Sequence, residues 1–150
     1  MESLTKISKD DFYSLTIPIL FNDEHTSRRF GIVGNKEVQF GLSWQSDLIE
    51  PVVTGIGLNI YGVGIDQNFA IFDLALNSIL FTLNLTYNFF TIQIFNDSVL
   101  VITELEIIRL SMLRFEILKR YPLPDYFDKS VLSGGFLEIK CVGNKSILIE

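Results

Sequence analysis

Apolar and polar residues alternate with a period of two along most of this chain, and that pattern predicts β-strands. In the first run, residues 13–21, every second side chain is apolar. Pro18 lies on the other face of this predicted strand, and because proline cannot donate a ladder hydrogen bond, the strand is expected at a sheet edge. Two further runs, residues 29–33 and 36–44, flank Gly34 and Asn35, which tolerate positive φ, and so predict a hairpin with a two-residue turn.

From residue 52 onward, short apolar runs are separated by clusters of Asn, Asp, Gly and Ser. Turns this short make neighbouring strands antiparallel. The spacing predicts an all-β, mainly antiparallel domain over residues 1–150: a sandwich, an open barrel or a partial-propeller-like sheet with at most one or two short helices. A closed propeller needs about sixteen strands, whereas the pattern supplies ten or so. The predicted strands in this part cover residues 54–65, 69–74, 78–85, 89–95, 98–110, 112–120, 136–142 and 146–150.

A helix competes with strand in one segment, residues 105–120, which is rich in Leu, Met, Glu and Arg. Alternation around Arg114 and Glu116 favours two strands that bend near Ser111 instead. If the chain has a helix elsewhere, residues 5–12 or 125–132 are the expected places.

Composition supports a folded domain that needs no covalent staple. Apolar residues make up 48% of the 150 residues, and a chain of this length buries about two thirds of its unfolded surface. Cys141 is the single cysteine, which excludes an internal disulfide and a zinc site built on several cysteines, so a reducing, cytoplasmic location is expected. Residues 1–21 do not follow the order of a secretory signal, and no apolar stretch has the ~20 residues of a membrane-spanning helix. We therefore expect a mature chain that begins at Met1 and has no membrane association.

The charges are distributed unevenly along the sequence. Between Lys36 and Arg109 there is no Lys, Arg or His, but there are eight carboxylates. This segment therefore carries a charge of −8 and the rest of the chain +2, which gives the net charge of −6. A concentrated acidic field attracts cationic partners and repels polyanions. A basic protein partner is thus favoured and nucleic acid disfavoured, while the alternative is that a soluble protein simply carries net charge.

No constellation of catalytic or metal-binding residues is visible. His25 is the only histidine and lies in a polar turn, and Cys141 shares a predicted strand face with Leu137 and Ile139. No acidic loop has the ligand spacing of a calcium site. We therefore expect no enzyme activity, no cofactor and no metal.

Glu104 and Glu106 are predicted on one strand face, with Cα atoms roughly 6.5 to 7 Å apart. Three roles are open for such a pair: both carboxylates are solvated, both bind cations of a partner, or the two act as the acid and base of a glycoside hydrolase. The hydrolase alternative would pair Glu104 with a distant carboxylate.

In size, acidity and lack of an active site, the chain resembles the small single-domain immunity proteins of bacterial contact-dependent inhibition and polymorphic toxin systems. No motif is shared, so no functional residue is carried over. The resemblance implies an inhibitor that neutralises a cognate, often basic, toxin or nuclease domain by tight one-to-one binding. The alternatives are a β-sandwich or barrel that binds a small molecule or sugar, and a structural subunit of a larger assembly. The hypothesis assigns partner binding to seven carboxylates: Asp47, Glu50, Asp66, Asp73, Asp97, Glu104 and Glu106.

Overall fold

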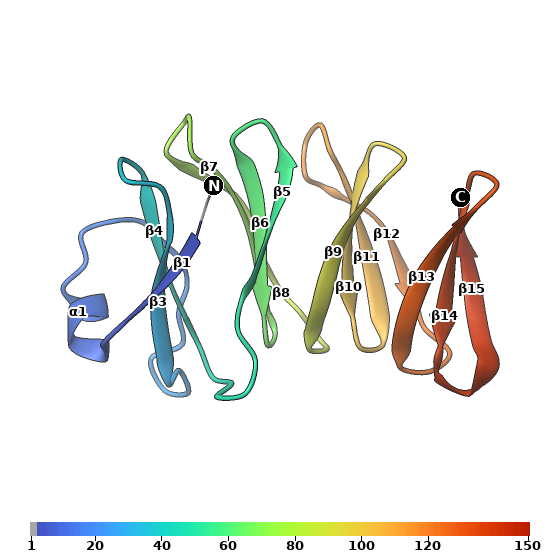
Figure 1. The fold of residues 1–150 in the computed structure, drawn as a ribbon, viewed down its shortest axis with the longest axis horizontal. Helices are drawn as coiled ribbons and strands as arrows, with labels where there is room; N and C mark the ends of the chain where they lie inside the picture. The colour runs from blue at the N-terminus through green and yellow to red at the C-terminus, as the bar shows by residue number, and fades with distance from the viewer. Residues whose placement is uncertain (1–2) are drawn as a thin grey trace. The chain divides into compact units, whose positions relative to one another are not determined.

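The computed structural model describes residues 3–150, and the chain divides into two compact units, Met1–Thr86 (unit 1) and Tyr87–Glu150 (unit 2). Within the described residues, fifteen strands form four mainly antiparallel sheets, accompanied by one α-helix and one 3-10 turn (Figure 1). The prediction of an all-β fold is confirmed. Each unit has its own hydrophobic core, and the single domain expected over residues 1–150 stays a prediction. No helix among residues 3–150 has the length and apolar character needed to span a membrane.

The first sheet of unit 1 has the order β1-β3-β4-β2. Its members are β1 (Ser3–Ile7), β3 (Arg29–Gly34), β4 (Gln39–Trp44) and β2 (Ile19–Phe21). The short strand β2 pairs in parallel with β4, whereas the other pairs are antiparallel. Phe40, Leu42 and Trp44 are fully buried on one face of β4, and Ser43 on its other face is buried as well.

The second sheet of unit 1 is a meander in which each strand pairs with the next along the chain. It comprises β5 (Val52–Gly57), β6 (Ile60–Ile65), β7 (Asn68–Asp73) and β8 (Ser78–Asn84). Residues of both sheets, including Trp44, Val63 and Phe72, form one buried cluster. Burial of this shared apolar surface holds the two sheets of unit 1 together.

Unit 2 repeats the meander. One sheet has the order β12-β11-β10-β9 and the other the order β13-β14-β15. Leu100, Ile107 and Ile139 are fully buried in a cluster that draws on both sheets. The strands are β9 (Phe89–Phe95), β10 (Ser98–Thr103), β11 (Glu106–Ser111), β12 (Ile117–Pro122), β13 (Phe127–Ser133), β14 (Phe136–Cys141) and β15 (Lys145–Ile149), with the 3-10 turn η1 (Val142–Asn144) before the last strand.

The predicted first strand, residues 13–21, is wrong over most of its length. The helix α1 (Lys9–Tyr13) ends at Tyr13, the first residue of the predicted strand, and within residues 13–21 only β2 is a strand. Ser8 caps α1 by accepting a hydrogen bond from the Asp11 N–H at 3.1 Å, a local bond that favours a helical turn. Pro18 precedes β2, which lies at the sheet edge as expected. The helix falls within the alternative range 5–12 except for its last residue.

Two predicted strands are hairpins, and β1 and β13 lie outside every predicted strand, which is why residues 3–150 form fifteen strands where the pattern supplied ten or so. Residues 54–65 contain a turn at Asn59, which has φ 61°. Residues 98–110 turn at Glu104 and Leu105, between β10 and β11. Neither Glu104 nor Leu105 is a typical turn residue, and the turn is closed by Thr103, whose Oγ1 donates to Glu106 O and accepts from Glu106 N.

The remaining turn predictions have mixed outcomes. β11 ends at Ser111 and β12 begins at Ile117, so the helix alternative for residues 105–120 is excluded, but the predicted strand 112–120 is a connecting turn over residues 112–116. The possible helix at residues 125–132 is wrong, because β13 occupies most of that range. The β3–β4 connection has four residues where two were predicted: Gly34 pairs with Gln39, and the Asn35 side chain accepts from the Glu37 and Val38 N–H groups.

The core of unit 2 gives a direct test of the packing. We expect Leu100→Ala to lower the free energy of unfolding by about 2–5 kcal/mol, because it removes a fully buried side chain and leaves a cavity. Leu118→Ala is the matched control, since Leu118 is 58% exposed, and we expect it to cost less than about 1 kcal/mol. Urea denaturation of both variants measures the difference, and equal losses would contradict this assignment of the core.

Candidate protein-binding surface

Three of the seven predicted carboxylates gather around the link between β4 and β5, and each of them has partners within the chain. Asp47 accepts from Arg29 Nε at 3.0 Å, and Arg28 Nη1 lies 3.7 Å from its other oxygen. Glu50 forms an ion pair with Lys6. These two carboxylates are therefore partly neutralised by cations that are distant from them in sequence.

Asp66 and Asp73 stabilise loops at opposite ends of β7. Asp66 Oδ2 accepts from the N–H groups of Gln45 at 2.8 Å and Ser46 at 3.1 Å, which makes it the third carboxylate at the β4–β5 link. Asp73 is only 7% exposed, and its Oδ1 accepts from the Ala75 and Leu76 N–H groups at 2.8 and 3.0 Å. Both side chains thus satisfy backbone donors that loops otherwise leave to water.

The other three predicted carboxylates lie in unit 2. Asp97 is exposed in the β9–β10 turn, whereas Glu104 lies in the turn at the opposite end of β10. Glu104 accepts from Asn88 Nδ2 at 3.1 Å, and Glu106 pairs with Arg120 at 2.9 Å. The expectation that Glu104 and Glu106 share a strand face is wrong, because the chain turns between them. In neither unit do the predicted carboxylates form a single patch, and their role in binding a partner stays a prediction.

A different surface of unit 1 combines exposed apolar and acidic residues. It is built on the face of the first sheet that points away from the unit 1 core. Phe30 and Val33 are an odd number of residues apart on β3 and so point to opposite faces; Val33 belongs to the core cluster. On the other face the Phe30 ring lies 5.1 Å from Phe12 of α1 and 6.0 Å from Tyr13.

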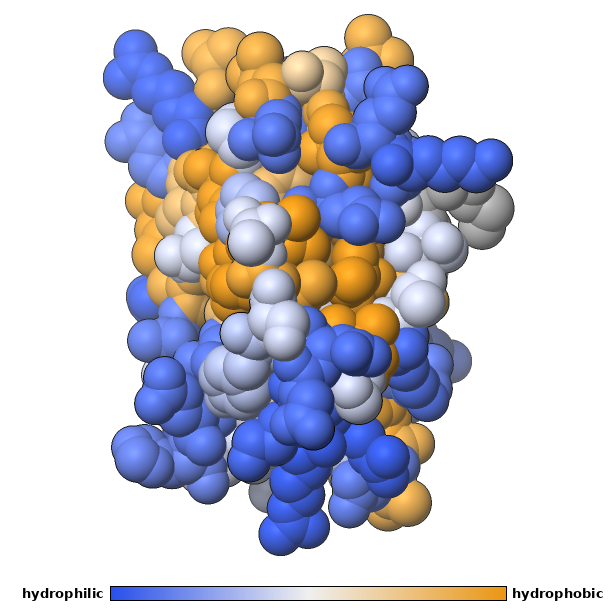
Figure 2. Space-filling model, turned by 90° about the vertical axis from the view of Figure 1, so that its left-hand side faces the viewer, coloured by the Kyte–Doolittle hydropathy of each residue, from blue (hydrophilic) through white to orange (hydrophobic). Residues whose placement is uncertain are grey.

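Gly41 of β4 allows α1 and the chain after it to lie directly on the sheet. A Cβ atom at Gly41 would come within 2.6 Å of Ile19 Cδ1 and 3.2 Å of Leu15 Cδ1. Phe12 is buried by this contact, while Tyr13 and Ile19 remain 47% and 36% exposed. Seen from this side, hydrophobic residues fill much of the middle of the surface, hydrophilic residues predominate below them, and the two kinds are mixed above (Figure 2).

Carboxylates lie next to these apolar side chains in α1 and in the loop after β2. The loop is ordered by its own hydrogen bonds: Asp23 Oδ1 accepts from the His25 N–H at 2.9 Å, and Asp23 O from the Ser27 N–H. Asn22 Nδ2 donates to the Tyr13 hydroxyl at 3.5 Å, which holds the loop beside α1. The backbone hydrogen bond from His25, followed by the side-chain hydrogen bond from Thr26, lowers the pKa of Asp23. This carboxylate is therefore ionised at neutral pH.

We define the α1 face by its two exposed apolar residues and four carboxylates: Tyr13, Ile19, Asp10, Asp11, Asp23 and Glu24. None of these four carboxylates forms an ion pair with another of residues 3–150. In sequence they stand near Lys9 and Arg28, so a charge count along the chain does not single them out. The signal that could have found them is a pair of acids on each side of the apolar run 12–21.

Comparison with known proteins gives no family for this chain. No protein-family model matches it, and no curated protein matches it.

The two residues with the most reactive side chains, Cys141 and His25, do not belong to the set that defines the α1 face. Cys141 is buried in the core of unit 2, and this burial raises the pKa of its thiol. His25 is exposed in the loop after β2. Among residues 3–150, no group of three or more His, Cys, Asp or Glu side chains is arranged to hold a metal ion.

The buried thiol predicts slow chemistry in the folded state. We expect Cys141 to react with an aromatic disulfide reagent at pH 8 only as fast as unit 2 opens, because both burial and the raised pKa keep the thiolate scarce. The raised pKa stabilises the fold below the unfolded thiol's pKa of about 8.5, and this contribution is lost as the pH rises through the folded value. Absorbance of the released thiolate, with and without urea, measures the rate. A native rate equal to that in urea would contradict the burial.

The role of Asp73 is tested by stability. We expect Asp73→Ala to lower the free energy of unfolding by about 1–2 kcal/mol, because two N–H groups lose their acceptor. Asp73→Asn keeps an acceptor oxygen and should recover part of the loss. Asp128→Ala, at an exposed position of β13, is the control and should change stability by less than about 0.5 kcal/mol. Thermal unfolding of the three variants checks this, and an Asp73→Ala loss no larger than the control would refute the loop role.

Proposed function

We propose that this protein is a binding inhibitor of the immunity type, which neutralises a cognate basic toxin domain by one-to-one association through the α1 face. The observation that carries the proposal is the presence of four carboxylates without a cationic partner among the described residues beside the exposed Tyr13 and Ile19. An apolar centre with a polar, charged rim is the usual composition of a protein–protein interface.

The two kinds of residue have separate roles in this proposal. Carboxylates of the α1 face attract a basic surface and raise the association rate, an effect that added salt screens. Tyr13 supplies contact area at low conformational cost and slows dissociation, as aromatic anchors do. The carboxylates at the β4–β5 link and in unit 2 contribute to the overall negative potential that surrounds the molecule.

The decisive experiment is protection of growth. The chain is co-expressed with each candidate basic toxin domain found by sequencing the region next to its gene, and binding of the purified pair is followed by surface plasmon resonance at low and physiological salt. The expected result is survival of the cells and an association rate that falls as salt rises. Failure to protect, together with failure to bind, would refute the proposal.

Substitutions test whether the α1 face is the surface that binds the toxin domain. We expect the quadruple variant Asp10→Asn, Asp11→Asn, Asp23→Asn and Glu24→Gln to lower the association rate about tenfold at low salt. Tyr13→Ala should weaken affinity about thirtyfold, mainly through faster dissociation.

The control for the quadruple variant changes the net charge by the same amount at four other exposed positions. It substitutes Glu37, Glu116, Asp128 and Glu150 with Gln or Asn. If this control slowed association as much as the quadruple variant, only net charge would matter and the α1 face would be the wrong surface.

A further inference from the structure

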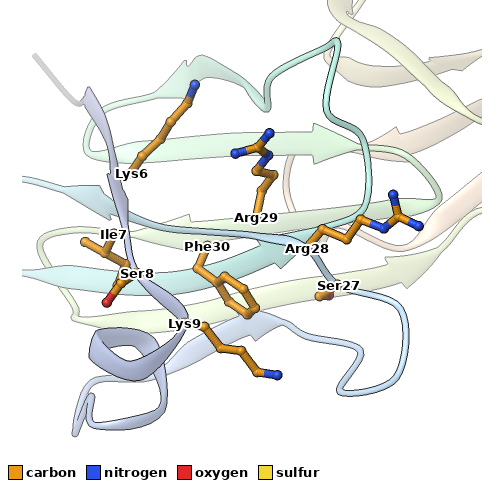
Figure 3. Close-up of a pocket in the computed structure, with 8 residues that line it drawn as sticks. All are labelled: Lys6, Ile7, Ser8, Lys9, Ser27, Arg28, Arg29 and Phe30. Atoms are coloured by element: carbon orange, nitrogen blue, oxygen red, sulfur yellow. The ribbon is translucent and has the colours of Figure 1, made fainter.

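A second surface of unit 1 has the opposite charge. An open pocket of about 490 Å³ lies where the end of β1, the start of α1 and the chain entering β3 meet. Its lining includes Lys6, Lys9, Arg28 and Arg29 and no carboxylate (Figure 3). These four are all of the Lys and Arg residues of unit 1 except Lys36. We call this site the basic pocket.

The cations of the basic pocket are only partly neutralised. Asp47 and Glu50 contact Arg28, Arg29 and Lys6 from outside the lining, so the four cations outnumber these two carboxylates by two. Lys9 forms no ion pair with another of the described residues. Within the lining itself the charge is therefore positive, although the carboxylates Asp10 and Asp11 follow Lys9 in the chain and Asp23 and Glu24 precede Arg28.

The uncharged residues of the pocket add one hydrogen-bond donor and an apolar wall. Ser8 Oγ accepts from the Asp11 N–H, which leaves its O–H free to donate. Ser27 is already engaged: Ser43 donates to Asn22, so the Ser27 hydroxyl donates to Ser43 at 2.8 Å. Ile7 and Phe30 also line the pocket, and in Figure 3 the Phe30 ring lies on the same side of β3 as Lys9, whereas Lys6 and Arg29 project to the other side.

Two arginines held at their positions are well suited to an oxyanion. The ion pair between Arg29 Nε and Asp47 restrains the Arg29 side chain, and Arg28 is held more weakly by the same carboxylate. Guanidinium groups bind phosphate through charge-assisted, often bidentate hydrogen bonds. The flexible ammonium of Lys9 adds a point charge on the other side of the pocket.

We propose that the basic pocket binds the phosphate groups of a small phosphorylated molecule. Lys9 and Arg28 make the principal charge contacts, Ser8 donates a hydrogen bond, and the wall formed by Ile7 and Phe30 excludes water from one side. This inference does not rest on the proposed function, since it concerns another surface and a ligand of opposite charge.

Titration with inorganic pyrophosphate tests the proposal, with chloride added to the reference sample to keep the ionic strength equal. We follow amide shifts in ¹⁵N-labelled protein. The expected result is saturable one-to-one binding, with shifts centred on residues 6–9 and 27–30. Absence of saturation up to about 10 mM, which corresponds to less than about 3 kcal/mol of binding free energy, would overturn the proposal.

Matched variants separate a local site from general charge. Lys9→Gln with Arg28→Gln should weaken pyrophosphate binding at least about tenfold. Lys36→Gln with Lys129→Gln removes the same charge elsewhere and should change affinity less than about twofold. All four positions are exposed, and the unchanged remainder of each spectrum shows that the variant is folded. Equal weakening by both pairs, or tighter binding of single-stranded DNA with shifts spread over all cations, would refute a small-molecule phosphate site.

Discussion

Burial on both faces of the first sheet of unit 1 is the constraint on which both proposed sites depend. One face supplies Phe40, Leu42 and Trp44 to the core of unit 1. The other face is covered by α1 through Phe12 and Phe30, and the lack of a side chain at Gly41 leaves room for this covering segment. Because apolar surface on both sides must be removed from water, α1 has one place to lie. That position exposes Tyr13 on one side and creates the basic pocket on another.

Charge pairing then decides which groups remain available to a partner. Arg28, Arg29 and Lys6 contact carboxylates of the β4–β5 link, and Asp66 and Asp73 are committed to backbone N–H groups. Exposed ion pairs of this kind add little stability. Their main consequence is electrostatic: they mask Asp47, Glu50 and Glu106 of the cation-free segment, whereas the carboxylates of α1 and the following loop have no such ion pair among the described residues.

Much of the fold could be predicted because strands follow a local rule. Alternation located β4 and the strands β7, β8 and β9, and Asn or Asp residues marked turns such as Asn96 and Asp97, both with positive φ. Prediction failed where the signal was absent or ambiguous. The turn at Glu104 and Leu105 is closed by the Thr103 side chain, a bond that composition does not reveal. The run 13–21 alternates, but a Ser8 cap and burial of Phe12 against Phe30 give a helix in its place.

The sequence by itself determined the all-β class, the excess of negative charge and the single cysteine, because period, composition and residue counts do not depend on contacts between distant residues. Only the tertiary structure decided which carboxylates are free. The ion pair of Asp47 with Arg29 joins residues 18 positions apart, and the bond of Asp66 to Gln45 joins residues 21 apart. Electrostatic energy depends on distance in space and on exposure to water, so a charge count along the chain could not show that Asp47 and Asp66 have partners while Asp97 stays exposed.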